Sequence, residues 1–182
     1  MLVELGENQV ALPVLALSAL IVVVRHRSLR PLLAAAAGVA LLLVTVIPAK
    51  ILIGRSGPGQ PAVVPGHLGV FPSGHTTTAG VCLALAVLLL APDLPPRIRR
   101  AAVAAMAALC FLVGVALIWR DFHWFTDVVA GWALAALIVL AVLRLAGPGT
   151  AARRGNSGSE SSAVTSEAVT GTREESDDSA RA

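Results

Sequence analysis

The sequence predicts an all-α protein, a multi-pass transmembrane bundle of about five membrane helices. Of its 182 residues, 56% are hydrophobic and only 14% are charged, against roughly 25% charged in a typical soluble domain. The few charges of residues 1–146 fall in short clusters between long apolar runs. This pattern excludes an ordinary water-soluble globule, and the apolar runs exclude a disordered chain over the same residues.

Each apolar run is close to the length that crosses a bilayer as a helix, which is about 20 residues with a range near 17–25. The first run is short and follows Asn8 and Gln9. The second contains Pro48 near its end, which a membrane helix accommodates by a local kink. Small residues within the later runs, such as Gly80 and Gly131, allow helices to approach closely in lipid. The predicted spans are approximately 9–24, 31–53, 74–91, 101–119 and 127–146.

The last 36 residues, 147–182, differ in composition from the rest of the chain. They contain no Leu, Ile, Met or aromatic residue and are rich in Ser, Thr, Glu and Asp. Such a segment has no apolar face to bury, so we expect a disordered polar tail after a transmembrane domain over residues 1–146.

The basic residues predict how the helices are oriented in the membrane. Nine Arg residues lie in the linkers 25–30 and 92–100 and from the end of the fifth span to residue 154, and the alternate linkers hold few. The positive-inside rule places the Arg-rich regions in the cytoplasm. We therefore expect a plasma-membrane protein whose N-terminus and loops 54–73 and 120–126 face outward and whose tail is cytoplasmic. The basic clusters act as topology determinants and do not indicate a nucleic-acid partner.

Polar residues from three distant parts of the sequence gather at the predicted outer ends of the spans. Ionisable residues at membrane depth are costly and are functional-site candidates by default. Each one alone has an ordinary explanation, such as snorkelling to the interface or capping a helix. Their joint occurrence on one face favours a functional site. These residues are Lys50, Arg55, Ser73, Gly74, His75, Arg120, His123 and Asp127.

The sequence around residue 74 predicts a helix start suited to an anion. Pro72 ends the loop, Ser73 can cap the helix, and the apolar run follows at once. Free N–H groups at a helix N-terminus favour phosphate, and Gly74 allows close backbone approach. His75 would lie beside the bound anion and could donate a proton to a leaving oxygen.

The stretch from Arg120 to Asp127 predicts a second chemical element. Arg120, His123 and Asp127 are spaced i, i+3 and i+7, so on a helix they share one face. An Asp beside a His holds one ring nitrogen as a donor and leaves the other nucleophilic, as in a hydrolytic triad. No Cys/His cluster or paired carboxylates accompany them, which predicts no metal. Cys82 and Cys110 lie within apolar runs and are expected to be packing residues.

These motifs resemble those of the type 2 phosphatidic acid phosphatases and their acid-phosphatase and haloperoxidase relatives. The family pattern is Lys, six residues, Arg-Pro; then Pro-Ser-Gly-His; then Ser-Arg, five residues, His, three residues, Asp. The resemblance covers residues 31–146, which look like the last four of the six helices usual in membrane members. The matching residues are Lys50 and Pro58, then Pro72, Ser73, Gly74 and His75, then His123 and Asp127.

Two arginines of the family pattern are absent. Gly57 stands in place of the first, and Ala116 and Leu117 stand in place of the Ser-Arg pair. Arg55 and Arg120 lie close to these positions in sequence, and a long, forked Arg side chain could reach the same phosphate from a shifted position.

The resemblance implies a lipid phosphatase that uses no metal and no organic cofactor. His123 would attack phosphorus and form a phosphohistidine, Asp127 would orient it, and His75 would protonate the leaving group. The substrate would be a lipid phosphate or a polyprenyl diphosphate in the outer leaflet. The residues expected to bind phosphate are Lys50, Arg55, Ser73, Gly74 and Arg120.

Two other functions are compatible with the sequence. A non-catalytic relative would bind lipid phosphate without turning it over, which the residues Gly57 and Leu117 suggest. A small helical scaffold with incidental motifs is a weaker interpretation. The enzyme is favoured because His75, His123 and Asp127 are all present, and such residues carry out chemistry rather than binding alone.

Overall fold

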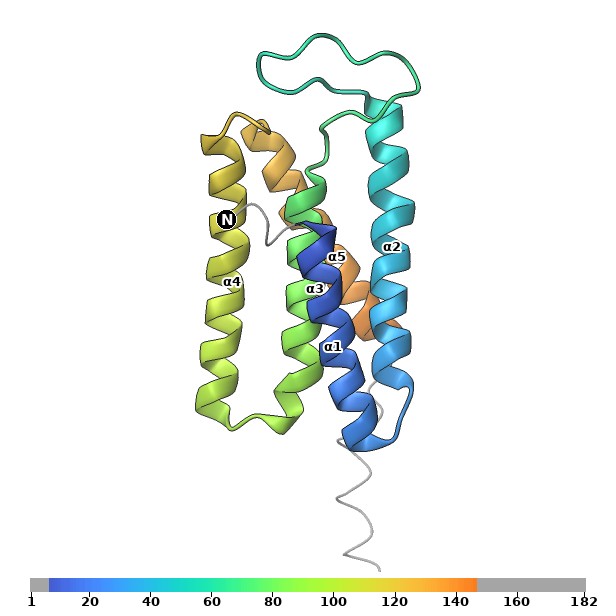
Figure 1. Ribbon diagram of the computed structural model, residues 1–182, viewed down its shortest axis with the longest axis vertical. Helices are drawn as coiled ribbons and strands as arrows, with labels where there is room; N and C mark the ends of the chain where they lie inside the picture. The colour runs from blue at the N-terminus through green and yellow to red at the C-terminus, as the bar shows by residue number, and fades with distance from the viewer. Residues whose placement is uncertain (1–6, 147–182) are drawn as a thin grey trace, which may run out of the picture. The chain divides into compact units, whose positions relative to one another are not determined.

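The computed structural model describes residues 7–146, which include five α-helices and a short 3-10 helix but no strand (Figure 1). The predicted all-α class is confirmed. The predicted tail, residues 147–182, lies outside the described residues. The helices are α1 (Asn8–His26), α2 (Arg30–Ile53), α3 (Gly74–Leu90), the 3-10 helix η2 (Ala91–Asp93), α4 (Pro96–Trp119) and α5 (Phe125–Leu145).

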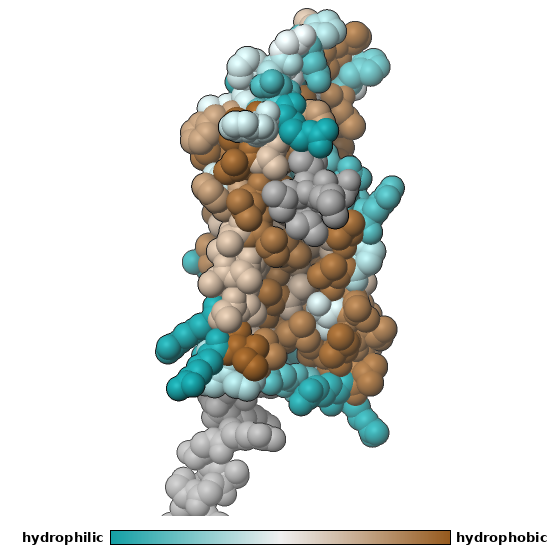
Figure 2. All heavy atoms as spheres, turned by 60° about the vertical axis from the view of Figure 1, so that its left-hand side comes forward, coloured by the Kyte–Doolittle hydropathy of each residue, from teal (hydrophilic) through white to brown (hydrophobic). Residues whose placement is uncertain are grey.

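All five α-helices are long and apolar enough to cross a membrane. Figure 2 shows hydrophobic residues over the middle of the helices on the face in view, with hydrophilic residues gathered towards both ends. Large apolar side chains such as Leu33, Leu52 and Leu137 are exposed. Lipid, which is as apolar as these side chains, accounts for that exposure, and the chain is a multi-pass membrane protein.

Helices extend beyond the apolar runs into the basic linkers. α4 begins at Pro96, before the predicted start at 101, because Pro fits the first turn of a helix and Arg97 and Arg99 continue it. Long Arg side chains keep their charge in water while their stems cover apolar surface, so the hydropathy pattern alone misses this turn. α1 likewise runs on through His26, whose Nε2 lies 3.0 Å from a carboxylate oxygen of Asp93 in η2.

α3 is the central helix of the bundle and contacts each of the other four (Figure 1). Of the residues in its apolar membrane-spanning stretch, 56% are buried, against 22–28% in the other helices. Close packing against α5 depends on small residues, because a Cβ at Gly80 would lie 2.6 Å from the Cβ of Ala135. The N-terminus of α3 is therefore held firmly where the ends of α2 and α5 meet it.

Candidate active site

Ser73 builds the N-terminus of α3 as predicted. Its Oγ accepts from the backbone N–H of Thr76 at 3.4 Å, and its carbonyl accepts from the N–H and the hydroxyl of Thr77 at 3.1 and 2.8 Å. The N–H groups of Gly74 and His75 have no acceptor among residues 7–146. Two free donors at a helix N-terminus form a site for an anion.

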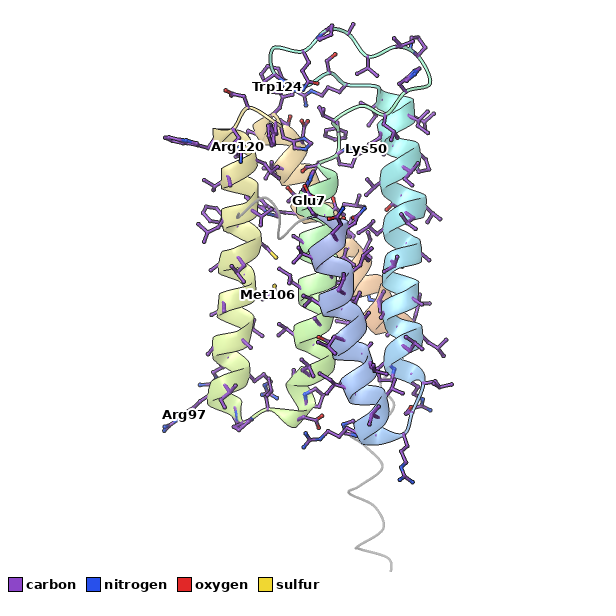
Figure 3. The ribbon with its side chains drawn as sticks, viewed as in Figure 1. Glu7, Lys50, Arg97, Met106, Arg120 and Trp124 are labelled. Atoms are coloured by element: carbon purple, nitrogen blue, oxygen red, sulfur yellow. The ribbon has the colours of Figure 1, made fainter. Side chains whose placement is uncertain are left out.

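Lys50 brings a positive charge to these free donors. Its Cε lies 3.5 Å from the position that a Cβ on Gly74 would occupy. Its Nζ donates to the carbonyl oxygens of Gly69 at 2.9 Å and Val70 at 3.3 Å. An ammonium group has three donors, so one remains for a phosphoryl oxygen. Figure 3 shows Lys50 where α2 meets the loop that leads to α3.

The two histidines face each other at the same end of the bundle. The ring centroids of His75 and His123 are 6.5 Å apart, and both rings line the same cavity. His123 is only 7% exposed, and its Nδ1 lies 3.4 Å from Oδ2 of Asp127. Nδ1 makes no hydrogen bond at this distance, and among the described residues this carboxylate is its one polar neighbour. Nε2, on the opposite side of the ring, is turned away from Asp127.

Asp127 is completely buried and joins three parts of the site. Its Oδ2 accepts from the backbone N–H of Trp124 at 3.0 Å, a capping contact at the start of α5. Its Oδ1 pairs with Nη1 of Arg55 at 2.9 Å. Its carbonyl oxygen accepts from the N–H of Ser73 at 3.0 Å, which ties α5 to the N-terminus of α3.

Arg55 is held against α5 by three contacts, of which the sequence predicted none. Besides Asp127, its Nη1 donates to the hydroxyl of Thr126 at 2.6 Å, and its guanidinium lies over the ring of Trp124 at 5.5 Å. The indole N–H of Trp124 donates to the carbonyl of Ser56 at 3.0 Å. Loop 54–73 is thus fastened to the site, and Trp124 and Thr126 are supporting residues that the motif spacing alone did not reveal.

Arg120 is not brought to the site, and this corrects the expectation of one helical face. α4 ends at Trp119, and residues 120–124 form a turn in which Asp121 has a left-handed φ of 54°. The exposed Arg120 places its guanidinium over Phe122 at 5.1 Å. Figure 3 shows Arg120 at the end of α4. Leu117, at the position of the family arginine, is fully buried in apolar packing. The other seven predicted residues lie together.

A cavity of about 610 Å³ opens beside the histidines. Its polar end is lined by Lys50, Gly74, His75 and His123, and its apolar part runs between α1 and α2 along residues such as Leu12, Val39, Leu42 and Val46. Glu7, Asn8 and Gln9 at the start of α1 complete the polar end. The sequence analysis did not place Glu7 in the site. The one feature that could have indicated it is that the N-terminus was predicted to lie on the same outer face as the site.

Burial lowers the pKa of His123 below the ordinary histidine value, and the nearby positive charge of Lys50 acts in the same direction. The Asp127 carboxylate opposes this shift without reversing it. His123 is therefore neutral at neutral pH, with a lone pair on the ring nitrogen that does not face Asp127.

We expect a nuclear magnetic resonance titration of the histidine rings to show His123 titrating below about 6.5, the ordinary value. Lys50→Met removes a positive charge that disfavours the imidazolium, so this variant should move the His123 titration upward. His123→Gln assigns the signal. A His123 titration at or above the ordinary value in the parent protein would contradict the electrostatics of the site.

The site and fold define a class of protein. The model of the PAP2 superfamily matches residues 31–149, more than half of the chain, and the chain belongs to this superfamily. Membership of this family makes it a membrane phosphatase. The resemblance inferred from the motifs is confirmed.

A solved relative shares the fold. The crystal structure described as the first transmembrane PAP2 type phosphatidylglycerolphosphate phosphatase from Bacillus subtilis superposes with a TM-score of 0.72. The match covers 83% of this chain and 76% of that chain at 21% identity, a likeness that shows the fold alone. A comparison with curated protein sequences finds no match.

Proposed function

We propose that this protein hydrolyses a lipid phosphate or polyprenyl diphosphate at the outer face of the plasma membrane through a phosphohistidine. One observation carries the proposal: His123, buried beside Asp127, faces His75 across a cavity that begins at two free N–H groups. A neutral nucleophile, an acid and an anion site are thereby combined in one place.

The reaction runs in two steps. Nε2 of His123 forms a bond to phosphorus while the bond from phosphorus to the leaving oxygen breaks, and His75 gives that oxygen its proton. Asp127 stabilises the positive ring through Nδ1. His75, now neutral, takes a proton from water as the water oxygen bonds to phosphorus. The bond from phosphorus to Nε2 then breaks, phosphate leaves, and both histidines return to their starting states.

The phosphoryl oxygens are held by backbone and cationic donors. We assign this role to the N–H groups of Gly74 and His75, to the remaining donor of Lys50 and to a guanidinium N–H of Arg55 that Asp127 leaves free. Ser73 acts by capping the helix that presents these groups. Such preorganised donors usually contribute more to catalysis than any other effect, because they stabilise charge as it develops.

The apolar part of the cavity supports a lipid substrate. It opens between α1 and α2, helices long and apolar enough to cross the membrane, so an acyl or prenyl chain could follow it to the histidines. The solved relative is a phosphatidylglycerolphosphate phosphatase, which is in line with this class of substrate.

Phosphate release from a panel of lipid phosphates, by purified protein in chelator-treated buffer, tests the proposal. Among the described residues no group of three or more His, Cys, Asp or Glu is placed to hold a metal, and we expect release without one. Saturable binding without release would instead identify a non-catalytic lipid-phosphate binder, the alternative that the buried Leu117 supports.

The two arginines are expected to differ in their effect on activity. Arg55→Ala removes the partner of Asp127 and a phosphate donor, so we expect kcat/KM to fall about a hundredfold. Arg120→Ala should stay within a few fold of the parent, because its guanidinium lies over Phe122 and outside the cavity. Measuring phosphate release for both variants shows whether each arginine contributes to turnover. Equal losses of kcat/KM in the two variants would contradict the assignment of Arg55, and not Arg120, to the site.

Cysteine labelling in intact cells tests the orientation. After the native Cys82 and Cys110 are replaced by alanine, a cysteine at Ser56 should react with an impermeant reagent added outside, and one at Ser157 should not. The positive-inside rule requires this result, because Ser157 follows the Arg-rich end of the last span. Labelling of position 157 from outside would overturn the proposed outward-facing site.

A further inference from the structure

Glu7 is a carboxylate at the cavity that the catalytic proposal does not use. It lies directly before α1 in an extended conformation, and its carbonyl accepts from the N–H groups of Val10 and Ala11 at 3.0 and 2.9 Å. Its Oε1 lies 3.8 Å from Nε2 of His75. The backbone bonds hold its Cα in place, and the half-exposed side chain lines the cavity.

Two charges of opposite sign and one neutral ring lie around His75. Lys50 on α2 and the ring of His123 lie on the side assigned to the phosphoryl group, and Glu7 lies at Nε2 of His75. Glu7 is the only acidic residue among those that line this cavity. The cavity is therefore cationic where phosphate would bind and anionic where a leaving group would depart.

We propose that Glu7 determines the leaving-group preference of this site, favouring lipid phosphomonoesters over diphosphates. The inference rests on the proposed function and narrows its substrate class. Glu7 belongs to a segment outside the residues 31–149 that match the family model, so the preference would be a property of this chain's own α1.

The preference follows from the charge left on the departing group. When the bond between phosphorus and oxygen breaks, its electron pair stays on the leaving oxygen, which takes the proton of His75. A monoester thereby releases a neutral alcohol, whose hydroxyl can donate to the carboxylate of Glu7. A diphosphate releases a lipid phosphate that is still negative after this protonation, and the nearby carboxylate repels it. Because Glu7 is half-exposed, the screened repulsion amounts to about five- to tenfold in rate.

The neighbours of Glu7 support a neutral leaving group. Asn8 and Gln9 line the cavity beside it. Their amides add donors and acceptors without adding charge, which suits an alcohol that carries further hydroxyl groups.

The test compares two substrates that share one chain, farnesyl phosphate and farnesyl diphosphate, with the purified full-length protein in detergent micelles. The ratio of kcat/KM for the monophosphate to that for the diphosphate should fall about five- to tenfold in Glu7→Gln. Glu7→Asp, which keeps the charge, should retain most of the preference. Asp121→Asn is the matched control, because it removes the same charge from a residue outside the cavity, and its ratio should equal that of the parent.

The outcomes separate the inference from the proposed function. A ratio in Glu7→Gln within twofold of the parent, with phosphate still released, would overturn the role of Glu7 alone. No release from either substrate, or from the wider lipid panel, would overturn the proposed function. In that case the affinities of the two farnesyl compounds, measured by competitive binding, still test the effect of the Glu7 charge. Glu7→Gln should raise the affinity for the diphosphate relative to the monophosphate.

Discussion

His123→Ala is expected to abolish phosphate release, lowering kcat by about 10⁴-fold or more, because no phosphohistidine can form without Nε2. The ring is buried beside Asp127 and its replacement leaves the anion site at Gly74 and Lys50 in place. Substrate should therefore still bind. Phosphate release and substrate affinity, measured on the same preparation, separate the loss of chemistry from a loss of fold.

His75→Ala provides the matched comparison, because its proposed role depends on the leaving group. An aryl phosphate with an activated leaving group needs little protonation, so this substrate should partly restore the rate of His75→Ala. It should not restore His123→Ala, which lacks the nucleophile. Equal restoration of both variants would contradict the two assigned roles.

Asp127→Asn is expected to lower kcat by about 10³- to 10⁴-fold. The amide keeps the size of the side chain and an oxygen that can accept from the N–H of Trp124, but it cannot stabilise the positive ring of His123. The partner Arg55 is partly exposed and reaches water when its ion pair is removed. We therefore expect a large loss of turnover with a small change in thermal stability.

Arg55→Gln is the control for Asp127→Asn, because it breaks the same ion pair and leaves the carboxylate beside His123. Its kcat should exceed that of Asp127→Asn by at least tenfold if orientation of the ring is the main role of Asp127. A kcat of Asp127→Asn within tenfold of that of the parent would show that the carboxylate stabilises the fold and does not orient His123 for catalysis.

The helices could be predicted from sequence because lipid leaves the backbone few choices. Unpaired N–H and C=O groups cannot be hydrogen-bonded to water in the bilayer core, so a long apolar run must be helical. The same reasoning failed at the start of α4, where the basic turn after Pro96 is helical and carries no apolar signal.

The site was predictable where its residues are neighbours in the sequence. Ser73, Gly74 and His75 follow one another at a helix start, and His123 and Asp127 are four apart. Contacts between distant segments were not predictable, such as Arg55 with Asp127 and Glu7 with His75, because they depend on how loop 54–73 and α1 pack. The turn that ends α4 at Trp119 and places Arg120 outside the cavity depends on a left-handed residue, Asp121, that no periodicity signals.

The central claim is that His123 carries the phosphoryl group during turnover. Rapid mixing with a ³²P-labelled lipid phosphate, an alkaline quench and peptide mass spectrometry test it directly. We expect a label that survives alkali, is lost in acid, maps to the peptide containing His123 and is missing in His123→Ala. A label on another residue, or phosphate release by the parent protein with an unlabelled His123 peptide at every quench time, would contradict the claim.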